Sequence, residues 1–348
     1  MQVQKREVWI DIAKFISIFL VVLFHTNPHL DGYIFEILQL LRMPAFFLIA
    51  GMLFNIDKWN QFTEFFKHRF SRLIIPYIWF SIGFYCLWLF IGRNMVGAEE
   101  LSIHPLIPIK EFLLGKPSVV LAPYWFITCL FTMQLLFYCL KKWIKHNYII
   151  ILIAISCYLA TICVDITDLP WCVDKAFCYL PFYVYANILK EHKNSLVLNK
   201  ATHTIVPTIA ALSILLVNSN FISSAAISYL LYIISGFAIM PAYIVLCKRL
   251  ATICTATPIK NTIKYVGDNN IITLALQNYI IGFIKILAAN LFAINILNTC
   301  YYSINVIITL VTIICSMFCA YLINKFTPFV IGKQTIKEYL FKQNTPKH

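Results

Sequence analysis

Charged residues are scarce in this sequence: only 12% of its 348 residues are Asp, Glu, Lys or Arg, whereas 60% are hydrophobic. Soluble domains carry about 25% charged residues. The mean hydropathy of +0.77 leaves too few polar side chains to cover a soluble globule, so the chain must be surrounded by lipid. The composition therefore predicts an all-α integral membrane protein with the lipid bilayer as its partner.

The sequence also lacks a recognisable cleavage site and a metal-binding cysteine pattern. The first apolar run, 12–24, has no small-residue cleavage site and ends at His25, so we interpret it as a retained first span. The 12 cysteines show no paired metal spacing, and of these Cys172 alone lies clearly in a loop. We expect no metal and no structural disulfides.

Long apolar runs recur along the chain at a length suited to membrane helices. Crossing the bilayer takes roughly 20 mostly apolar residues, and no stretch between the runs is long enough for a soluble domain. We therefore predict a single membrane domain, residues 1–348, folded as a bundle of about ten transmembrane helices. The expected spans are 10–26, 34–54, 73–92, 124–140, 148–164, 176–189, 203–218, 225–247, 271–293 and 303–324.

Basic residues between the runs predict the orientation of the chain. With the N-terminus in the cytoplasm, 21 of the 28 Lys and Arg fall in cytoplasmic segments and 4 in outer loops. Basic residues are retained on the cytoplasmic side, so both termini are predicted to be cytoplasmic. This retention also explains the net charge of +13, and we expect no nucleic-acid partner.

The first span carries three polar side chains that are costly in a membrane. Asp11, Lys14 and His25 fall on one face of a helix, but Lys14 and His25 lie about 16 Å apart along its axis. This geometry favours a polar passage through the bilayer, with His25 as a candidate general base. The alternatives are an interfacial Asp11–Lys14 ion pair and a histidine in the headgroup layer.

Three further sites combine charge or aromatic character with a position near the membrane. Arg42 lies inside the second span, two residues before Pro44, and either functions there or reaches the surface. Arg69 and Arg72, spaced i,i+3 before the third span, can bind phosphate or anchor the chain to anionic lipid. Trp125 begins the fourth span and either binds substrate or joins an interfacial aromatic belt.

The order of these motifs resembles the acyltransferase-3 family of membrane-bound acyltransferases, and more closely its fucose O-acetylase-like subgroup. The resemblance extends over nearly the whole chain. Its residues are Arg6, Asp11, Lys14, Val21, Val22 and His25; Met43, Pro44, Phe46, Phe47 and Gly51; Arg69, Arg72, Pro76 and Tyr77; Tyr124 to Ile127; and Tyr265 to Asn270.

The resemblance implies an O-acyltransferase, usually an O-acetyltransferase, that uses acyl-CoA as its donor. Acetyl-CoA would be the cofactor, and a hydroxyl of a cell-surface polysaccharide or its precursor would be the glycan acceptor. His25 matches the essential histidine of the family, and Arg69 and Arg72 match the pair linked to the donor. We expect Lys14 and Asp11 to be catalytic together with His25, and Arg42 to join Arg69 and Arg72 in binding the donor. Lys14 or Arg42 could also stabilise the oxyanion. The chain departs from the family at Arg42, at Gln277 and at Ala186.

Two other function classes remain open at this stage. A multi-spanning glycan transporter or flippase would explain the charges inside the spans, but would give the Arg pair no purpose. A lipid-linked glycan polymerase should have a large basic outer loop, which this chain lacks. The absence of a sorting signal and the abundance of Ile, Asn and Lys favour a bacterial cytoplasmic membrane.

Overall fold

The computed structural model describes residues 7–26, 33–92, 103–116, 122–164, 166–191, 208, 225–292 and 302–334. All regular elements within these residues are helical. The main helices are α1 (Val8–Thr26), α2 (Tyr33–Leu53), α3 (Phe62–Arg69), α4 (Ile75–Leu87), α7 (Leu106–Leu113), α8 (Trp125–Trp143), α9 (Asn147–Cys163), α10 (Val173–Glu191), α12 (Ala225–Ile253), α13 (Thr257–Asp268), α14 (Asn270–Phe292) and α15 (Tyr302–Phe326).

Five helical stretches among the described residues are long and apolar enough to cross a membrane: Val8–Thr26, Phe62–Phe90, Ile233–Ile253, Asn270–Ala288 and Ser303–Phe326. Two shorter apolar helices, Leu40–Leu53 and Asn147–Cys163, accompany them. The described part of the chain is therefore all-helical, and the protein is a multi-pass membrane protein. A total of ten crossings and the cytoplasmic placement of both termini stay predictions.

The predicted spans coincide with helices wherever the structure describes them, and the span 203–218 lies outside the described residues except for Thr208. The third span differs from the prediction because its helix begins at Phe62 instead of 73. A π-helical segment, η2 (Phe70–Ile74), joins α3 to α4 without a break, and a second one, η3 (Trp88–Gly92), follows α4. The sixth predicted span, 176–189, lies within α10, which continues through Pro181.

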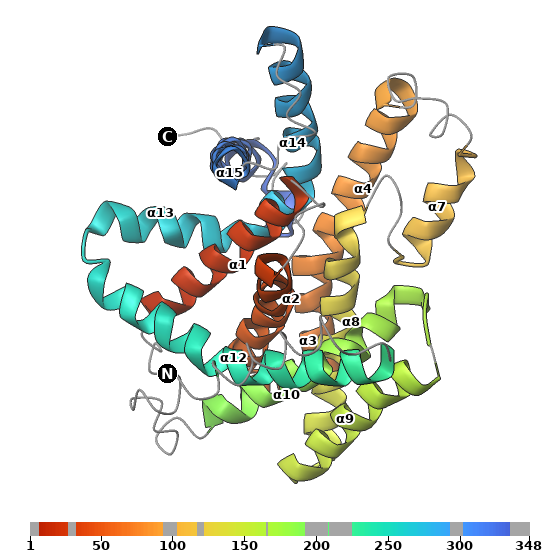
Figure 1. Cartoon of the computed structure of the whole chain (residues 1–348). Helices are drawn as coiled ribbons and strands as arrows, with labels where there is room; N and C mark the ends of the chain where they lie inside the picture. Colours follow the sequence, from red (N-terminus) through yellow and green to blue (C-terminus); the bar gives the residue numbers. More distant parts are fainter. Residues whose placement is uncertain are drawn as a thin grey trace, which may run out of the picture. The chain divides into compact units, whose positions relative to one another are not determined.

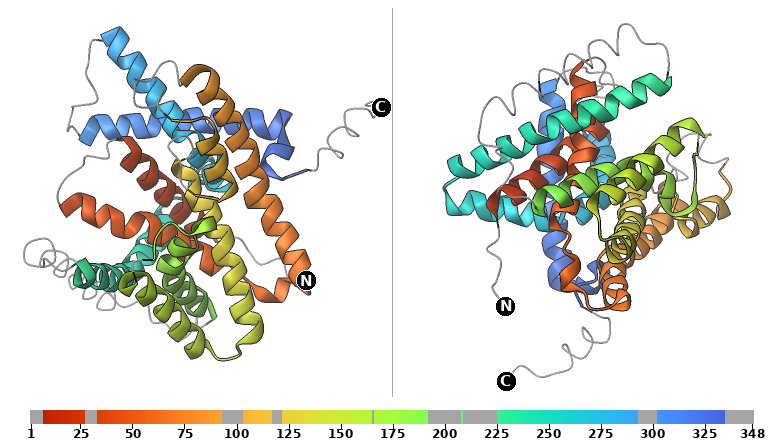
Figure 2. Two further views of the ribbon diagram at one scale, coloured as in Figure 1. Left: turned by 90° about the vertical axis from the view of Figure 1, so that its right-hand side faces the viewer. Right: turned by 90° about the horizontal axis from the view of Figure 1, so that it is seen from below.

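The chain forms two compact units, which we describe separately. The first contains residues 1–54 and 182–318, and α1 is its central helix. Helix α1 packs against α2, α12, α13 and α14 (Figure 1). A view from below shows α1 between α12 and α13 (Figure 2, right). These contacts surround the helix that carries Asp11, Lys14 and His25.

The second unit contains residues 55–181 and 319–348. In this unit α8 packs against the helical segments η2 and η5 (Pro170–Cys172), and aromatic side chains join it to α3 in an antiparallel arrangement. Phe65 stacks on Tyr138 with ring centroids 4.6 Å apart, and Phe66 meets Phe131 edge-on at 5.8 Å. Large aromatic rings bury much apolar area and prefer such geometries. This pairing fixes the helix that carries Arg69 and Arg72.

Candidate active site

Helix α1 is held in place by hydrogen bonds from two distant parts of the chain. The buried hydroxyl of Tyr243 in α12 donates to the Ala13 carbonyl at 2.7 Å and lies 3.0 Å from the Ser17 hydroxyl. The Asn270 side chain, at the start of α14, donates to the Lys14 carbonyl at 3.4 Å. Because these contacts involve the backbone and Ser17, they fix both the position and the rotation of α1.

Replacing Tyr243 with Phe is expected to destabilise the protein by about 1 kcal/mol, because it removes a buried hydroxyl that bonds to α1. Thermal unfolding in detergent, followed by intrinsic fluorescence, should show a transition about 2 °C lower. Tyr148→Phe is the matched control because Tyr148 is exposed on α9. An unchanged transition for Tyr243→Phe would contradict this role.

The structure brings His25 and Arg42 together at the C-terminal end of α1. The Arg42 guanidinium carbon lies 3.5 Å from the centre of the Phe24 ring. The same ring meets the His25 imidazole edge-on, with centroids 5.3 Å apart. Arg42 is also close enough to His25 for an electrostatic interaction. A possible general base and a fixed cation therefore share one location, with Phe24 between them.

Asp11 and Lys14 lie toward the opposite end of α1. Asp11 is buried and Lys14 is half-buried. Gly267 packs against this region: a β-carbon on Gly267 would lie 3.4 Å from the Lys14 side chain and 3.6 Å from the Asp11 carbonyl oxygen. The structure thus joins two separate sequence motifs, the one at the start of α1 and the one at the α13–α14 junction. It does not bring Lys14 to His25.

Arg69 and Arg72 occupy different environments in the second unit. The Arg69 guanidinium is half-buried, 5.2 Å from the Phe65 ring centre and 5.9 Å from that of Trp59. Arg72 is exposed. Arg72 lies in the π-helical segment η2, which changes its direction relative to Arg69 from that of an i,i+3 pair on a regular α-helix. Single π-helical turns often occur at functional sites.

The C-terminal part of the chain packs closely beside the Arg pair. Ser71, between the two arginines, donates from its hydroxyl to the Gly332 carbonyl at 3.0 Å. Gly332 has φ +62°, and a β-carbon there would lie 1.8 Å from the Ser71 carbonyl oxygen. Only glycine fits this approach. The short helix η7 (Pro328–Ile331), which precedes Gly332, is therefore fixed next to the arginines.

Trp125 lies at the start of α8 and contacts two residues near the start of α10. Its ring stacks on Tyr179 with centroids 6.3 Å apart and an interplanar angle of 24°. The Lys175 ammonium group lies 5.6 Å from the Trp125 ring centre. All three side chains are half-buried. Together they form a small aromatic and cationic surface in the second unit.

The sequence analysis missed several of these contacts. Trp59 could have been found as an aromatic residue ten positions before Arg69. Tyr179 has no such signal, and neither does Tyr243, because its partners on α1 are some 230 residues away in the sequence. Asp11, Lys14, His25 and Arg42 belong to the first unit, whereas Arg69, Arg72 and Trp125 belong to the second.

Comparison with known proteins agrees with this arrangement of motifs. No curated protein and no solved structure matches the chain. One family model, described as an acyltransferase domain, matches residues 7–325. The match covers nearly the whole chain and includes every candidate residue on α1, α2, α3, η2 and α8. The chain therefore belongs to the acyltransferase-3 family of membrane acyltransferases.

Proposed function

We propose that this protein is an O-acetyltransferase that moves an acetyl group from cytoplasmic acetyl-CoA to a hydroxyl of a cell-surface polysaccharide or its precursor. The observation that carries the proposal is the cluster of His25, Phe24 and Arg42, which places a base beside a cation. The family membership supports acyl transfer. The acetyl group, the CoA donor, the glycan acceptor and the likeness to fucose O-acetylases are proposals.

In the proposed reaction, His25 acts as the general base. Its neutral imidazole takes the proton from the sugar hydroxyl as the hydroxyl oxygen attacks the thioester carbonyl. Arg42 stabilises the oxyanion of the tetrahedral intermediate. The carbon–sulfur bond then breaks, and the thiolate of CoA takes the proton from the imidazolium. The products are an acetyl ester on the sugar and free CoA.

Arg42 is better placed than Lys14 to stabilise the oxyanion. Both residues were candidates on sequence grounds. Arg42 shares the Phe24 ring with His25, whereas Lys14 lies eleven residues away on the same helix, about 16 Å along its axis. We therefore propose that Arg42 stabilises the oxyanion. Lys14 and Asp11 are assigned to the structure of the α1–α13 junction, where Gly267 packs beside both residues.

Arg69 and Arg72 are proposed to bind the phosphates of CoA. Guanidinium groups bind phosphate oxygens with paired hydrogen bonds, and the exposure of Arg72 leaves its side chain accessible. Trp59 provides an aromatic surface near Arg69 on which an adenine ring could stack. These features favour a phosphorylated, purine-containing donor over a simple lipid anchor.

The acceptor is proposed to bind at Trp125 and Tyr179. Aromatic rings pack against the apolar faces of sugar rings, and the Lys175 ammonium group can donate hydrogen bonds to sugar oxygens. In the orientation that the basic residues predict, Trp125 would lie toward the outer face. With ten crossings and both termini in the cytoplasm, the protein would lie in a bacterial cytoplasmic membrane, with its donor on one side and its acceptor on the other.

Replacing both Arg69 and Arg72 with Ala is expected to raise the KM for acetyl-CoA by about 10²-fold, because two charge-assisted phosphate contacts of about 1.5 kcal/mol each are lost. The kcat at saturating donor should change little. Turnover measured across a range of acetyl-CoA concentrations tests this. Lys141→Ala/Lys142→Ala, which removes two basic residues elsewhere in the unit, is the control. An unchanged KM would contradict the assignment.

A further inference from the structure

Helix α13 connects two helices of the first unit that each contain a candidate membrane span, Ile233–Ile253 in α12 and Asn270–Ala288 in α14. Figure 1 shows α13 joining them and running in a direction different from that of α14. A segment between the end of one span and the start of the next lies at one surface of the membrane. The charges of Lys260 and Lys264 also exclude α13 from the hydrocarbon. Helix α13 therefore lies at the membrane–water interface.

The start of α1 lies at the same level as α13. A β-carbon on Gly267 would lie 3.4 Å from the Lys14 side chain. The Lys248 ammonium group, near the end of α12, lies 5.8 Å from the centre of the Trp9 ring, and tryptophan is enriched at membrane interfaces. One end of each of three membrane helices, α1, α12 and α14, thus meets α13. In the orientation that the basic residues predict, this surface is cytoplasmic.

One face of α13 is apolar and only partly covered by protein. Ile259, Ile263 and Val266 have the i, i+4, i+7 spacing of a single helix face. Val266 is 2% exposed, whereas Ile259, two turns earlier, is 53% exposed, and Ile253 at the end of α12 is 74% exposed. We call this region, residues 246–268, the α12–α13 corner. Exposed apolar side chains at an interface are covered by the upper part of the lipid chains.

The α12–α13 corner also carries an excess of positive charge. Residues 244–267 contain four basic side chains and no acidic one: Lys248, Arg249, Lys260 and Lys264. Asp268, at the far end of α13, is the first acidic residue after them. Counting Lys14 together with Glu7, Asp11 and Asp268 still leaves two net positive charges in this region.

Two of the lysines are placed so that a bound anion would stabilise them. Lys260 and Lys264 are four positions apart on one side of α13, where like charges repel each other. Lys264 is exposed and Lys260 is half-buried, and Arg249 on α12 is exposed as well. A phosphate group beside these side chains would remove the repulsion and accept their hydrogen bonds.

We propose that the α12–α13 corner binds the headgroups of anionic phospholipids in the adjacent leaflet. Arg249, Lys260 and Lys264 contact the phosphates, and each contributes about 1 kcal/mol. Ile253 and Ile259 pack among the first carbons of the acyl chains. The bound lipid holds α13 against the start of α1. The site does not depend on the proposed acyltransferase chemistry.

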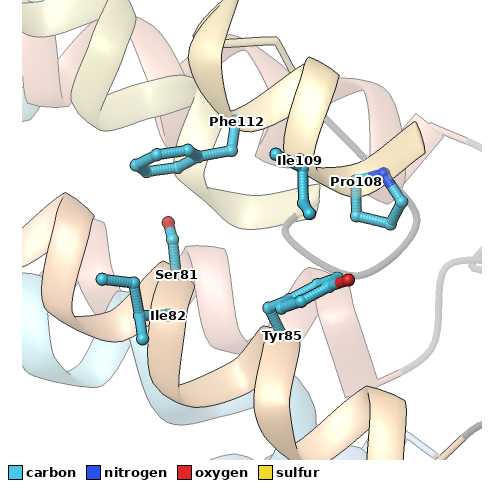
Figure 3. Close-up of a pocket in the computed structure, with 6 residues that line it drawn as sticks. All are labelled: Ser81, Ile82, Tyr85, Pro108, Ile109 and Phe112. Carbon is cyan, nitrogen blue, oxygen red and sulfur yellow. The ribbon is translucent and has the colours of Figure 1, made fainter. Parts of the chain in front are cut away.

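Helix α7, in the second unit, provides the comparison. It also exposes large apolar side chains, with Leu106 63% and Leu113 65% exposed, and it faces α4 across an apolar cavity of ≈ 190 Å³ (Figure 3). Its neighbouring residues Lys110 and Glu111 have opposite charges, so the helix does not select an anionic ligand. Lys110 is exposed and Lys116, just after the helix, is half-buried, which matches the exposure of the α13 pair.

The test uses the full-length protein in a neutral detergent and phosphatidylglycerol that carries a photoreactive diazirine beside its headgroup. Irradiation followed by peptide mass spectrometry should place label on residues 246–268. Lys260→Gln/Lys264→Gln should weaken labelling there about 10- to 30-fold, because two contributions of about 1 kcal/mol each are lost. Lys260→Arg/Lys264→Arg should retain it, because arginine keeps the charge. Lys110→Gln/Lys116→Gln is the control and should leave the label on the corner unchanged.

Competition experiments distinguish an anionic lipid from other ligands. Unlabelled phosphatidylglycerol should displace the label and phosphatidylcholine should not. Equal displacement by both lipids, or unchanged labelling of the corner in a Lys260→Gln/Lys264→Gln protein that elutes normally in gel filtration, would overturn the proposal. If CoA or inorganic phosphate displaces the label while phosphatidylglycerol does not, the corner binds a free phosphorylated ligand and the lipid proposal is wrong. None of these measurements requires turnover, so their outcome is independent of the proposed function.

Discussion

His25→Ala is expected to lower the kcat for acetyl transfer by about 10³-fold or more, with little change in the KM for acetyl-CoA. The effect follows from the loss of the base beside Phe24 and Arg42, since general-base catalysis contributes about 10²–10⁴-fold. Release of free CoA thiol, followed with a chromogenic reagent in the presence of a glycan extract, measures it. His146→Ala is the matched control because this exposed histidine precedes α9.

Arg42→Ala should lower kcat by about 10²–10³-fold if Arg42 stabilises the oxyanion. Combining it with His25→Ala should add little, because the two residues act on the same transition state and their effects are not additive. If His25→Ala retains full activity, the base lies elsewhere. If the Arg42 and His25 effects multiply fully, the two residues act in separate steps.

Gly51→Ala is expected to destabilise the protein by about 3 kcal/mol, at the upper end of the range for overpacked sites. A β-carbon at this position would lie 2.3 Å from the Tyr183 carbonyl oxygen and 3.1 Å from the Ala186 β-carbon. The backbone of α10 would have to move. That movement would also disturb the hydrogen bonds from Asn187 to the Gly51 and Phe54 carbonyls, at 3.1 and 3.2 Å.

Gly282→Ala in the same unit is the control for this substitution. No atom lies within 4 Å of a β-carbon placed there, and Gly282 is inside a helix, so alanine should be neutral or stabilise by up to about 1 kcal/mol. Thermal unfolding in detergent compares the two variants. Equal unfolding temperatures for Gly51→Ala and Gly282→Ala would show that the α2–α10 contact is less close than described.

Much of the organisation could be predicted because lipid imposes simple rules on sequence. Backbone groups in a bilayer must be satisfied within helices, so the predicted spans coincide with helices where the structure describes them. The helices α3, α7 and α13 lie outside the predicted spans. The first predicted span, 10–26, coincides with α1. The small residues Gly51 and Ala186, both named in the sequence analysis, lie close together in the structure, since a β-carbon on Gly51 would lie 3.1 Å from that of Ala186.

The parts that sequence could not predict depend on contacts between distant residues. Nothing in the sequence places Tyr243 against Ser17, or Gly332 against Ser71, because each pair lies more than 200 positions apart. The helix containing Arg69 begins eleven residues earlier than predicted, because aromatic pairing with α8 extends it past the apolar run. Whether Arg42 or Lys14 accompanies His25 was open on sequence grounds, and packing around Phe24 favours Arg42.

At Gln277 the chain departs from the family pattern, and the structure shows what this residue can do. The sequence has Gln where family members often have His. Gln277 is fully buried in α14, which packs against α1, and neither amide atom has a hydrogen-bond partner among the described residues. A neutral amide can donate and accept hydrogen bonds but cannot act as a base near neutral pH. This residue cannot replace His25 in proton transfer.

The most direct test of the proposed function is acetyl transfer by the purified protein in proteoliposomes, with acetyl-CoA and a polysaccharide extract. The account predicts that the unchanged protein releases free CoA and leaves a base-labile acetyl ester on the glycan, and that His25→Ala does neither. If no glycan extract supports thioester cleavage, and the protein instead moves glycan across the membrane, the acyltransferase account is contradicted and a transporter is the better description.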